Sequence, residues 1–444
     1  MKRRFVSLLL LILLIVSLGS CSNKNVLLFL NWGEYIDEEL LEDFEEKYNC
    51  TVVMDLGESN EIFYSKVRSG TTVYDVVCPS DYMVEKMYAK DMLLKLDFSK
   101  LPNFNRNNLL VGVNHIVAEM ERNHSGISDY FVPYLWGTWG IMYSTEKEGL
   151  ESAVKSANNE WDSLFDRSSL PSNTNVAMYD SHLHAYYAAC KYLGLDPYVE
   201  LDDEKLDEIY DLVRKMNFDV WGTDNIKKDI VAGNVDLGFM WTGDFLYYYA
   251  EQIAARVIEA YSNQDITIND INLMIEALTS NNGVYLSKSN KEYKVGFDLY
   301  IPSDTIAFSD NLVIPKDSDN VDLAHKFINF MASNEVSIGN SKVKPAYSNA
   351  YYVCYNTPFN NVFDSLVSLS KYEFNNEDQL DYIDEIESGV ESYDTTLYYN
   401  IYDVAIGIAF DKYYKKDEVK GHILAAFERK YINIINTTFN NARA

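Results

Sequence analysis

Three short segments of the sequence combine aromatic side chains with an acidic side chain. They are Asn31-Trp32-Gly33-Glu34-Tyr35, Phe239-Met240-Trp241-Thr242-Gly243-Asp244 and Phe308-Ser309-Asp310. Aromatic faces attract ammonium groups by about 0.5 to 2 kcal/mol, depending on how completely water is removed. A buried carboxylate supplies the counter-charge that a desolvated cation requires. These residue types predict a pocket for an organic amine, although Trp32 could instead belong to the core and Glu34 could cap a helix.

Motifs of catalysis are absent from the sequence. It has no Gly-x-Ser-x-Gly turn, no glycine-rich phosphate loop and no His-Glu-x-x-His run. His182 and His184 form the one close pair among six histidines. Side chains two residues apart on a helix point in different directions, so these two histidines are not expected to share a metal ion. We therefore expect no metal site and no cofactor. A carboxylate pair for glycoside hydrolysis stays an open alternative, because its separation is a spatial property.

The first aromatic and acidic segment is expected between a strand and a helix. Residues 26–30 form an apolar run typical of a buried strand, and apolar side chains then recur at helical spacing up to Tyr48. Residues 51–54 and 74–78 predict two further strands, and Pro79-Ser80-Asp81 has the residue types of a helix start. This alternation predicts an α/β fold, whose mostly parallel sheet binds ligands beyond the carboxyl ends of its strands.

A second region repeats the alternation. Strands are predicted over 175–178 and 235–241, with helices over 183–192 and 206–216. A separate helix is predicted within 264–282, starting at Asn269 or Asp270. The tail from residue 351 to 444 shows no chemical motif.

Composition and charge narrow the class of partner. The sequence has 67 acidic and 38 basic residues, a net charge of −29, whereas nucleic-acid binding requires positive charge for phosphates. We therefore expect no nucleic-acid partner. A hydrophobic content of 47% with only 20 Gly and 9 Pro excludes a disordered chain, and 444 residues predict roughly two to three domains.

The first residues resemble a bacterial lipoprotein signal. Three basic residues precede an apolar run over 5–18 and the segment Leu18-Gly19-Ser20-Cys21. We expect removal of residues 1–20 and lipidation of Cys21. The protein would then lie at the extracytoplasmic face of a bacterial cell membrane or in the periplasm. The alternative is an uncleaved membrane-spanning anchor, for which an apolar run of this length is short. Cys50, Cys78, Cys190 and Cys354 are expected to be free buried thiols, with one disulfide as the alternative.

Several separated motifs, in this order, resemble the spermidine/putrescine-binding proteins of polyamine ABC importers. Beyond the first segment they are Glu58-Ser59-Asn60-Glu61 with Tyr64, Tyr74-Asp75-Val76-Val77 with Pro79-Ser80-Asp81-Tyr82, Val132-Pro133-Tyr134-Leu135-Trp136-Gly137, Gly238-Phe239-Met240-Trp241 and Ser309-Asp310-Asn311-Leu312-Val313-Ile314-Pro315. The resemblance implies a two-lobe α/β fold of the periplasmic-binding-protein kind with crossing hinge strands. The lobes are expected at 26–136 plus 309–350 and at 137–308 plus 351–444, with an insertion at about 251–296.

The resemblance also implies ligand contacts. The residues that stand where family members contact their ligand are Trp32, Glu34, Tyr35, Ser80, Tyr82, Asp180, Trp241, Phe308 and Asp310. His184 stands where family members usually carry a carboxylate, and Asp244 is expected to replace that missing group. A His184 that lies in the pocket and titrates near its ordinary pKa of about 6.5 would repel the amine as the pH falls from about 8 to 6.

The leading hypothesis is a lipid-anchored, monomeric receptor that captures a polyamine, spermidine or putrescine, and delivers it to an ABC permease without performing chemistry. The same scaffold with another small cation is the related alternative. From other classes, the alternatives are a secreted glycan hydrolase and a surface adhesin that uses the tyrosine-rich tail. Stoichiometric amine binding without turnover separates the receptor from the hydrolase, and an adhesin would need an extended exposed patch.

Overall fold

One mixed β-sheet runs through the computed structural model, which describes residues 25–223, 225–280, 283–375 and 395–444. Among these residues nine strands form the sheet in the order β2-β1-β3-β11-β4-β7-β5-β6, with β10 paired to one end of β4. They are β1 (Val26–Asn31), β2 (Thr51–Leu56), β3 (Val76–Val77), β4 (Phe131–Ser144), β5 (Val176–Tyr179), β6 (Val220–Gly222), β7 (Leu237–Trp241), β10 (Phe297–Tyr300) and β11 (Ala307–Val313). The predicted α/β class is confirmed.

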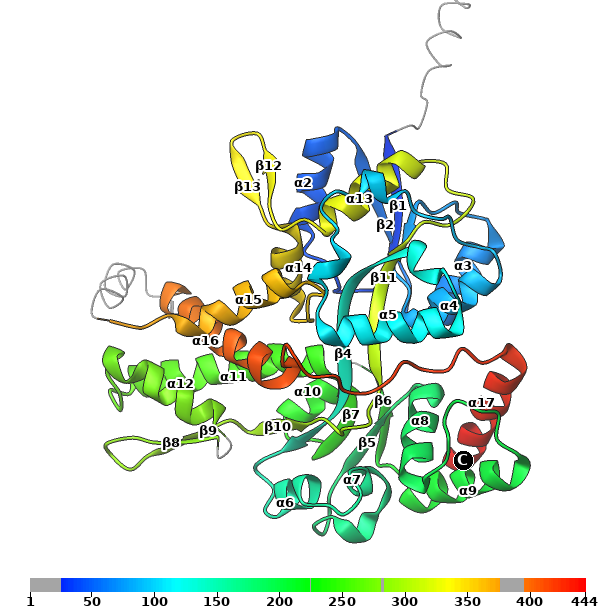
Figure 1. Cartoon of the computed structure of the whole chain (residues 1–444). Helices are drawn as coiled ribbons and strands as arrows, with labels where there is room; N and C mark the ends of the chain where they lie inside the picture. The colour runs from blue at the N-terminus through cyan, green and yellow to red at the C-terminus, as the bar shows by residue number, and fades with distance from the viewer. Residues whose placement is uncertain (1–24, 224, 281–282, 376–394) are drawn as a thin grey trace, which may run out of the picture.

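The upper half of the molecule in Figure 1 is built around β1, which pairs in parallel with both β2 and β3. Leu27, Phe29 and Leu30 of β1 are fully buried, as expected for a strand in a sheet covered by helices. The helices of this half are α2 (Glu39–Tyr48), α3 (Asn60–Ser69), α4 (Asp81–Ala89), α5 (Val111–Asn123), α13 (Val321–Met331) and α14 (Pro345–Val353), with the hairpin β12 (Val336–Ile338) and β13 (Ser341–Val343).

Two antiparallel strands, β4 and β11, connect the halves (Figure 1). All 14 residues of β4 are buried, and a strand of this length spans roughly 45 Å. Its first part pairs with β11, and its last part pairs with β7 and β10 of the lower half. The β4–β11 register shifts between Asp310 and Asn311, and such an irregularity re-aims the side chains beside it.

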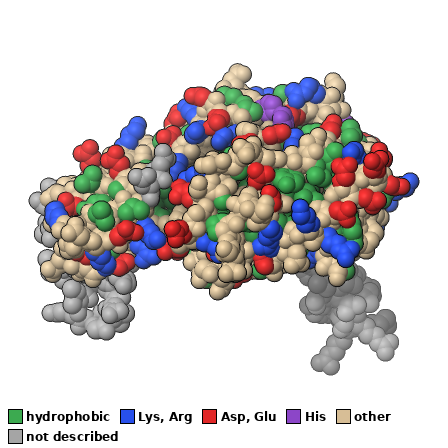
Figure 2. Space-filling model, turned by 90° about the horizontal axis from the view of Figure 1, so that it is seen from below, with side chains coloured by type: hydrophobic (Ala, Val, Ile, Leu, Met, Phe, Trp, Pro, Cys, Tyr) green, Lys and Arg blue, Asp and Glu red, His purple; other side chains and the backbone are tan. Residues whose placement is uncertain are grey.

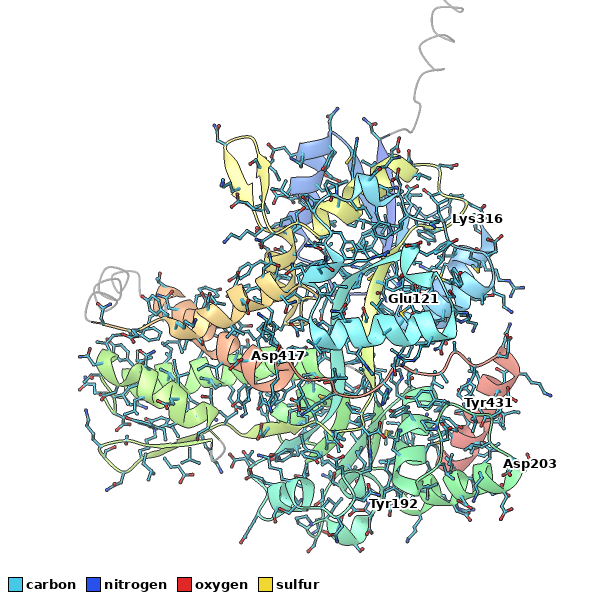
Figure 3. All side chains as sticks on the ribbon, in the orientation of Figure 1. Glu121, Tyr192, Asp203, Lys316, Asp417 and Tyr431 are labelled. Carbon is cyan, nitrogen blue, oxygen red and sulfur yellow. The ribbon has the colours of Figure 1, made fainter. Side chains whose placement is uncertain are left out.

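The lower half contains β5, β6 and β7 and a second set of helices. They are α6 (Leu150–Lys155), α7 (Asp162–Phe165), α8 (His182–Leu193), α9 (Asp203–Met216), α10 (Asn225–Val231) and α17 (Arg429–Arg443). The last helix, α17, packs against α8 and α9 (Figure 1). Its Tyr431, labelled in Figure 3, accepts a hydrogen bond from the Leu201 amide at 2.7 Å.

Further helices form an arm at one side of the molecule. They are α11 (Thr242–Ser262), α12 (Ile271–Thr279), α15 (Asn360–Ser368) and α16 (Thr395–Tyr414), with the hairpin β8 (Val284–Leu286) and β9 (Glu292–Lys294). Helix α16 packs along α11, so the predicted insertion and the tail support one another. The helix predicted within 264–282 is α12, which begins directly after the predicted cap residue Asp270 and ends at Thr279. A 3-10 turn precedes it, closed by a capping box between Thr267 and Asp270.

Two further predictions concern the chain as a whole. The four cysteines of the described residues are free thiols, as expected. Three of them are buried as predicted, whereas Cys50 is only half-buried. Cys21 and the predicted signal segment lie outside the described residues. Among the residues that are described, no helix has both the length and the apolar character to cross a membrane.

On the face shown in Figure 2, acidic side chains lie among basic ones.

Candidate ligand-binding site

The centre of the candidate site is the carboxylate of Asp310 on the crossing strand β11. Tyr35 Oη donates a hydrogen bond to Oδ2 at 2.8 Å, and Ser80 Oγ donates to Oδ1 at 2.6 Å. Asp310 is only 6% exposed. Burial raises its pKa to about 6, and the hydrogen bonds from Ser80 and Tyr35 limit the rise. The structure therefore brings together three residues that the sequence places on separate turns.

Ser80 is held in place by Asn60 at the start of α3. The Asn60 Nδ2 donates to Ser80 Oγ at 2.9 Å, and the Ser80 amide donates back to Asn60 Oδ1 at 3.0 Å. Tyr82, on the first turn of α4, is also buried. Between them, Asp81 accepts hydrogen bonds from the Ser309 and Tyr82 amides at 2.7 and 2.6 Å, which fixes the start of α4 against the strand that carries Asp310.

Four aromatic rings continue from this carboxylate toward the lower half. The ring centroids of Tyr35 and Tyr355 are 5.0 Å apart, those of Tyr355 and Phe308 are 6.2 Å apart, and those of Phe308 and Trp241 are 4.5 Å apart. We call these four residues the aromatic wall. Tyr355 fits because Gly243 has no side chain: a Cβ there would lie 2.5 Å from the tyrosine ring. The residues of the aromatic wall thus come from both halves of the molecule.

A second acidic group, Asp244, lies at the lower end of the aromatic wall. Its Oδ1 accepts hydrogen bonds from Tyr355 Oη at 3.1 Å and from Lys227 Nζ at 2.8 Å. The side chains of Lys227 and Asp244 are only 13% and 12% exposed. Asp244 therefore lies beside the aromatic wall, and it already binds an ammonium group that belongs to the chain.

Asp180 follows β5 and pairs with the C-terminal helix. Arg443 Nη1 donates to Asp180 Oδ1 at 2.7 Å, and the arginine Cζ lies 4.4 Å from the centroid of the Trp221 ring. The Asp180 side chain is 40% exposed. The predicted combination of a carboxylate and an aromatic ring around a cation does form here, but the cation is a side chain of α17.

The predicted role of His184 needs correction. The imidazole is buried, stacked on Trp139 with centroids 4.2 Å apart, and its Nδ1 is hydrogen bonded to Ser181 Oγ at 2.6 Å. Burial lowers the pKa of His184 to about 3. His184 is therefore neutral between pH 6 and 8, and it cannot repel a cation in that range. The histidine acts instead as a support behind Trp241, whose ring centroid is 5.4 Å away.

Trp32 and Glu34 lie on the turn after β1. The Trp32 Nε1 donates to the Cys78 carbonyl at 2.8 Å, and its ring packs 4.4 Å from that of Phe63. Glu34 is exposed at a φ of 53°, a left-handed conformation that few non-glycine residues adopt. It does not cap a helix, because α2 begins only at Glu39. Trp32 thus packs against the core and stays partly exposed.

Comparison with known proteins decides the class. Residues 30–338 match the family model of the bacterial extracellular solute-binding proteins. The chain belongs to this family. It is 27% identical over 345 residues to the putrescine-binding periplasmic protein SpuD of Pseudomonas aeruginosa, covering 76% of this chain and 82% of that protein. To the putrescine-binding periplasmic protein PotF of Escherichia coli it is 26% identical over 330 residues, covering 73% and 78%.

Solved structures share the fold of this solute-binding protein. The spermidine/putrescine ABC transporter substrate-binding protein PotD of Streptococcus pneumoniae superposes with a TM-score of 0.56 at 23% identity, covering 95% of this chain and all of the other. The Tp0655 lipoprotein of Treponema pallidum gives a TM-score of 0.55 at 21% identity, covering 94% and 99%. The predicted fold of the periplasmic-binding-protein kind is confirmed.

Sequence reasoning missed several residues of the candidate site of this solute-binding protein. Tyr355 comes from the tail, where no motif was found, and Lys227 and Arg443 are basic residues on helices that carry no local signal. Arg443 and Asp180 are 263 positions apart. A motif search for acidic and aromatic residues could not find basic partners, because these pairs form only when distant elements pack together.

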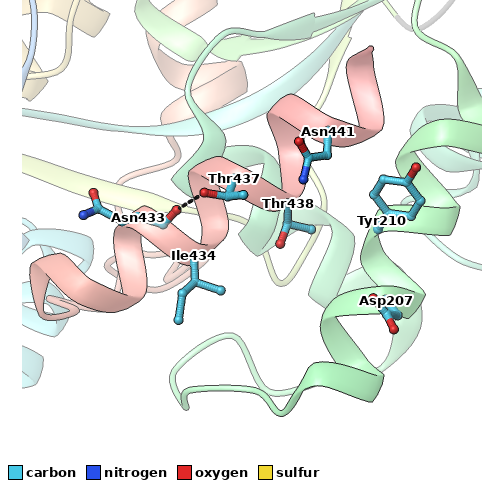
Figure 4. Close-up of a pocket in the computed structure, with 7 residues that line it drawn as sticks. All are labelled: Asp207, Tyr210, Asn433, Ile434, Thr437, Thr438 and Asn441. Carbon is cyan, nitrogen blue, oxygen red and sulfur yellow. Dashed lines mark hydrogen bonds between the residues drawn. The ribbon is translucent and has the colours of Figure 1, made fainter.

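The molecule also has a groove away from the aromatic wall. It has a volume of about 610 Å³ and lies between α9 and α17 (Figure 4), lined by Asp207, Tyr210, Asn433, Ile434, Thr437, Thr438 and Asn441. None of these is a residue that the sequence predicts for the site. The groove is therefore separate from the candidate site around Asp310 and the aromatic wall.

Proposed function

We propose that the protein binds a polyamine, putrescine or spermidine, between two lobes and delivers it to the permease of an ABC importer. The observation that carries the proposal is the buried Asp310 carboxylate, hydrogen bonded by Tyr35 and Ser80 and followed directly by the aromatic wall. A carboxylate supplies the counter-charge for one ammonium group, and ring faces attract it further. The named relatives that bind putrescine support the same ligand class.

The charges of the proposed site favour a diamine. Its four acidic residues are Glu34, Asp180, Asp244 and Asp310, and two of them pair with Arg443 and Lys227. Four negative charges less two positive charges leave two, the buried Asp310 and the exposed Glu34, and this number matches the two ammonium groups of putrescine. A triamine would bring one more positive charge than the site neutralises, and uncompensated buried charge is costly.

The proposal includes the course of the chain. The first lobe comprises 26–136 plus 309–350, and the second comprises 137–308 plus 351–444, so that β4 and β11 act as the hinge. Tyr355 lies between the two, because its ring contacts Tyr35 and Phe308 while its hydroxyl binds Asp244. Ligand entry requires these contacts to separate. Lipidation of Cys21 would hold a monomeric receptor beside its permease.

Thermal unfolding of the full-length protein with putrescine, spermidine, glucose and glutamate tests the function. A ligand at 100 times its Kd that binds only the folded state stabilises it by about 2.7 kcal/mol. We expect the amines alone to raise the Tm, and Asp310→Asn to abolish most of the rise. Asp203→Asn is the control, since Asp203 is exposed at the start of α9 (Figure 3). Equal shifts with glucose, or none with either amine, would refute the proposal.

A further inference from the structure

Two histidines and a glutamate meet where the C-terminal tail crosses the molecule. His115 and Glu119 are four residues apart on α5, which places them on one face of the helix. His422 comes from the segment between α16 and α17. One ligand atom from each residue lies within 4.8 Å of the others. The sequence gives no sign of this cluster, because Glu119 and His422 are 303 positions apart.

One atom of the cluster is poorly satisfied. The Nε2 of His115 is buried, and it makes no hydrogen bond with any of the described residues. It lies 3.4 Å from Glu119 Oε1, to which His422 Nδ1 is hydrogen bonded at 2.6 Å. A buried polar atom without a partner costs about 1 to 3 kcal/mol. This cost suggests that His115 is arranged for a partner other than a protein side chain.

We propose that His115, Glu119 and His422 bind a zinc ion. Two imidazoles and one carboxylate are ligands that Zn²⁺ prefers, whereas Ca²⁺ and Mg²⁺ prefer oxygen alone. Zinc bonds of about 2.0 to 2.2 Å in tetrahedral geometry place ligand atoms roughly 3.3 Å apart. The 3.4 Å between His115 Nε2 and Glu119 Oε1 already fits. The other atoms need shifts of roughly 1 Å or somewhat more, and water completes the fourth position.

Other charges around the cluster are compatible with a cation. Arg122 Nη2 lies 3.4 Å from Glu119 Oε1, but its side chain is 64% exposed and can turn into solvent. Asp304 lies 3.9 Å from His422 Nε2, and it is itself paired with Lys191 Nζ at 2.7 Å, so this pair adds no net charge. The net charge of −29 raises the local concentration of divalent cations at the surface.

The position of the cluster indicates what the ion does. The backbone of His422 accepts a hydrogen bond from the Ala307 amide at 2.9 Å and donates one to the Thr305 carbonyl at 3.0 Å. In Figure 1 this tail passes below α5 between the two halves of the molecule before it reaches α17. Zinc would fasten the tail to α5 of the upper half and to the start of the crossing strand β11.

Calorimetric titration of the full-length protein, stripped of metal with EDTA, tests the proposal with ZnCl₂ and CaCl₂. We expect one zinc ion per chain and no calcium binding. Loss of even an outer partner of a metal site lowers affinity about 10- to 100-fold. We therefore expect Glu119→Gln and His422→Ala to lower zinc affinity at least about 100-fold. Glu119→Gln keeps an oxygen acceptor for the Ile423 amide, 3.2 Å away in wild type, so its tail can stay in place.

His124→Ala is the matched control, because His124 ends the same helix but packs on Tyr88 with ring centroids 5.8 Å apart. It should bind zinc as wild type does. Hydrogen exchange gives an independent readout: zinc should slow exchange of amides in 415–428 in wild type and in His124→Ala, but not in His422→Ala. The absence of stoichiometric zinc binding in wild type, or equal affinity in wild type and His422→Ala, would overturn the assignment. Neither result depends on amine binding.

Discussion

Replacing Lys227 with methionine should change which amine the site prefers. Lys227 Nζ lies 2.8 Å from Asp244 Oδ1, and both side chains are largely buried. While this ammonium pairs with Asp244, a ligand cannot use the carboxylate fully. Methionine has a similar length and no charge, so Lys227→Met removes the ammonium and keeps most of the packing. Tyr355 Oη continues to donate to Asp244.

The expected gain belongs to the triamine. A hydrogen bond to a charged group contributes about 1.5 to 3 kcal/mol, so pairing the third ammonium of spermidine with Asp244 should raise the spermidine-to-putrescine affinity ratio roughly 10- to 100-fold. The extra negative charge also attracts putrescine. At about 10 Å in water that attraction is roughly 0.4 kcal/mol, or about twofold in affinity. The ratio of affinities therefore isolates the direct pairing.

The substitution has a cost in stability. Breaking a buried ion pair by removing one partner destabilises a protein by about 3 to 5 kcal/mol. The double variant Lys227→Met/Asp244→Asn removes the uncompensated carboxylate, so it should recover stability and return the affinity ratio toward the wild-type value. Calorimetry with both amines at pH 8 and one salt concentration, with melting curves for each protein, makes the comparison. A folded Lys227→Met variant with an unchanged ratio would refute the charge count.

The remaining predictions concern four other residues. Trp241→Ala should weaken amine binding by about 1 to 3 kcal/mol in calorimetry, because the ring forms part of the cation's wall; unchanged affinity would exclude it from the site. Amine affinity should fall about tenfold per pH unit below about pH 6. Burial raises the pKa of Asp310 to about 6, and protonation of this carboxylate removes the acceptor of the ammonium group. The His184→Gln variant should show the same pH dependence, whereas an affinity that stays constant from pH 7 to 5 would contradict the role of Asp310. Gly243→Ala should lower affinity by displacing Tyr355 from its place against the helix start, and near-ultraviolet circular dichroism would detect the moved ring; an unaltered spectrum and affinity would count against this role. Cys21→Ser should release the protein from the membrane fraction while leaving its amine binding intact, and continued membrane association with Met1 retained would disprove lipidation.

Local patterns in the sequence determined most of the secondary structure. The apolar run at 26–30 forms β1, and the helical spacing after it forms α2, because burial of one face is decided by neighbours within a few positions. The three aromatic and acidic turns could be found for the same reason. All three segments, with Tyr35, Asp244, Phe308 and Asp310, do converge in the folded chain, because the turns after β1 and β7 lie beside the crossing strand β11 that carries Phe308 and Asp310.

Tertiary structure decided what each of these groups binds. Asp310 meets Tyr35 across 275 positions, Asp180 meets Arg443 across 263, and Glu119 meets His422 across 303. His184 became a neutral support because Trp139 of β4 covers it. Burial and charge pairing depend on elements that are distant along the chain, so no local pattern reports them. The sequence alone therefore indicated residues suited to a cation, and only the fold decided which carboxylates the chain's own basic side chains already occupy.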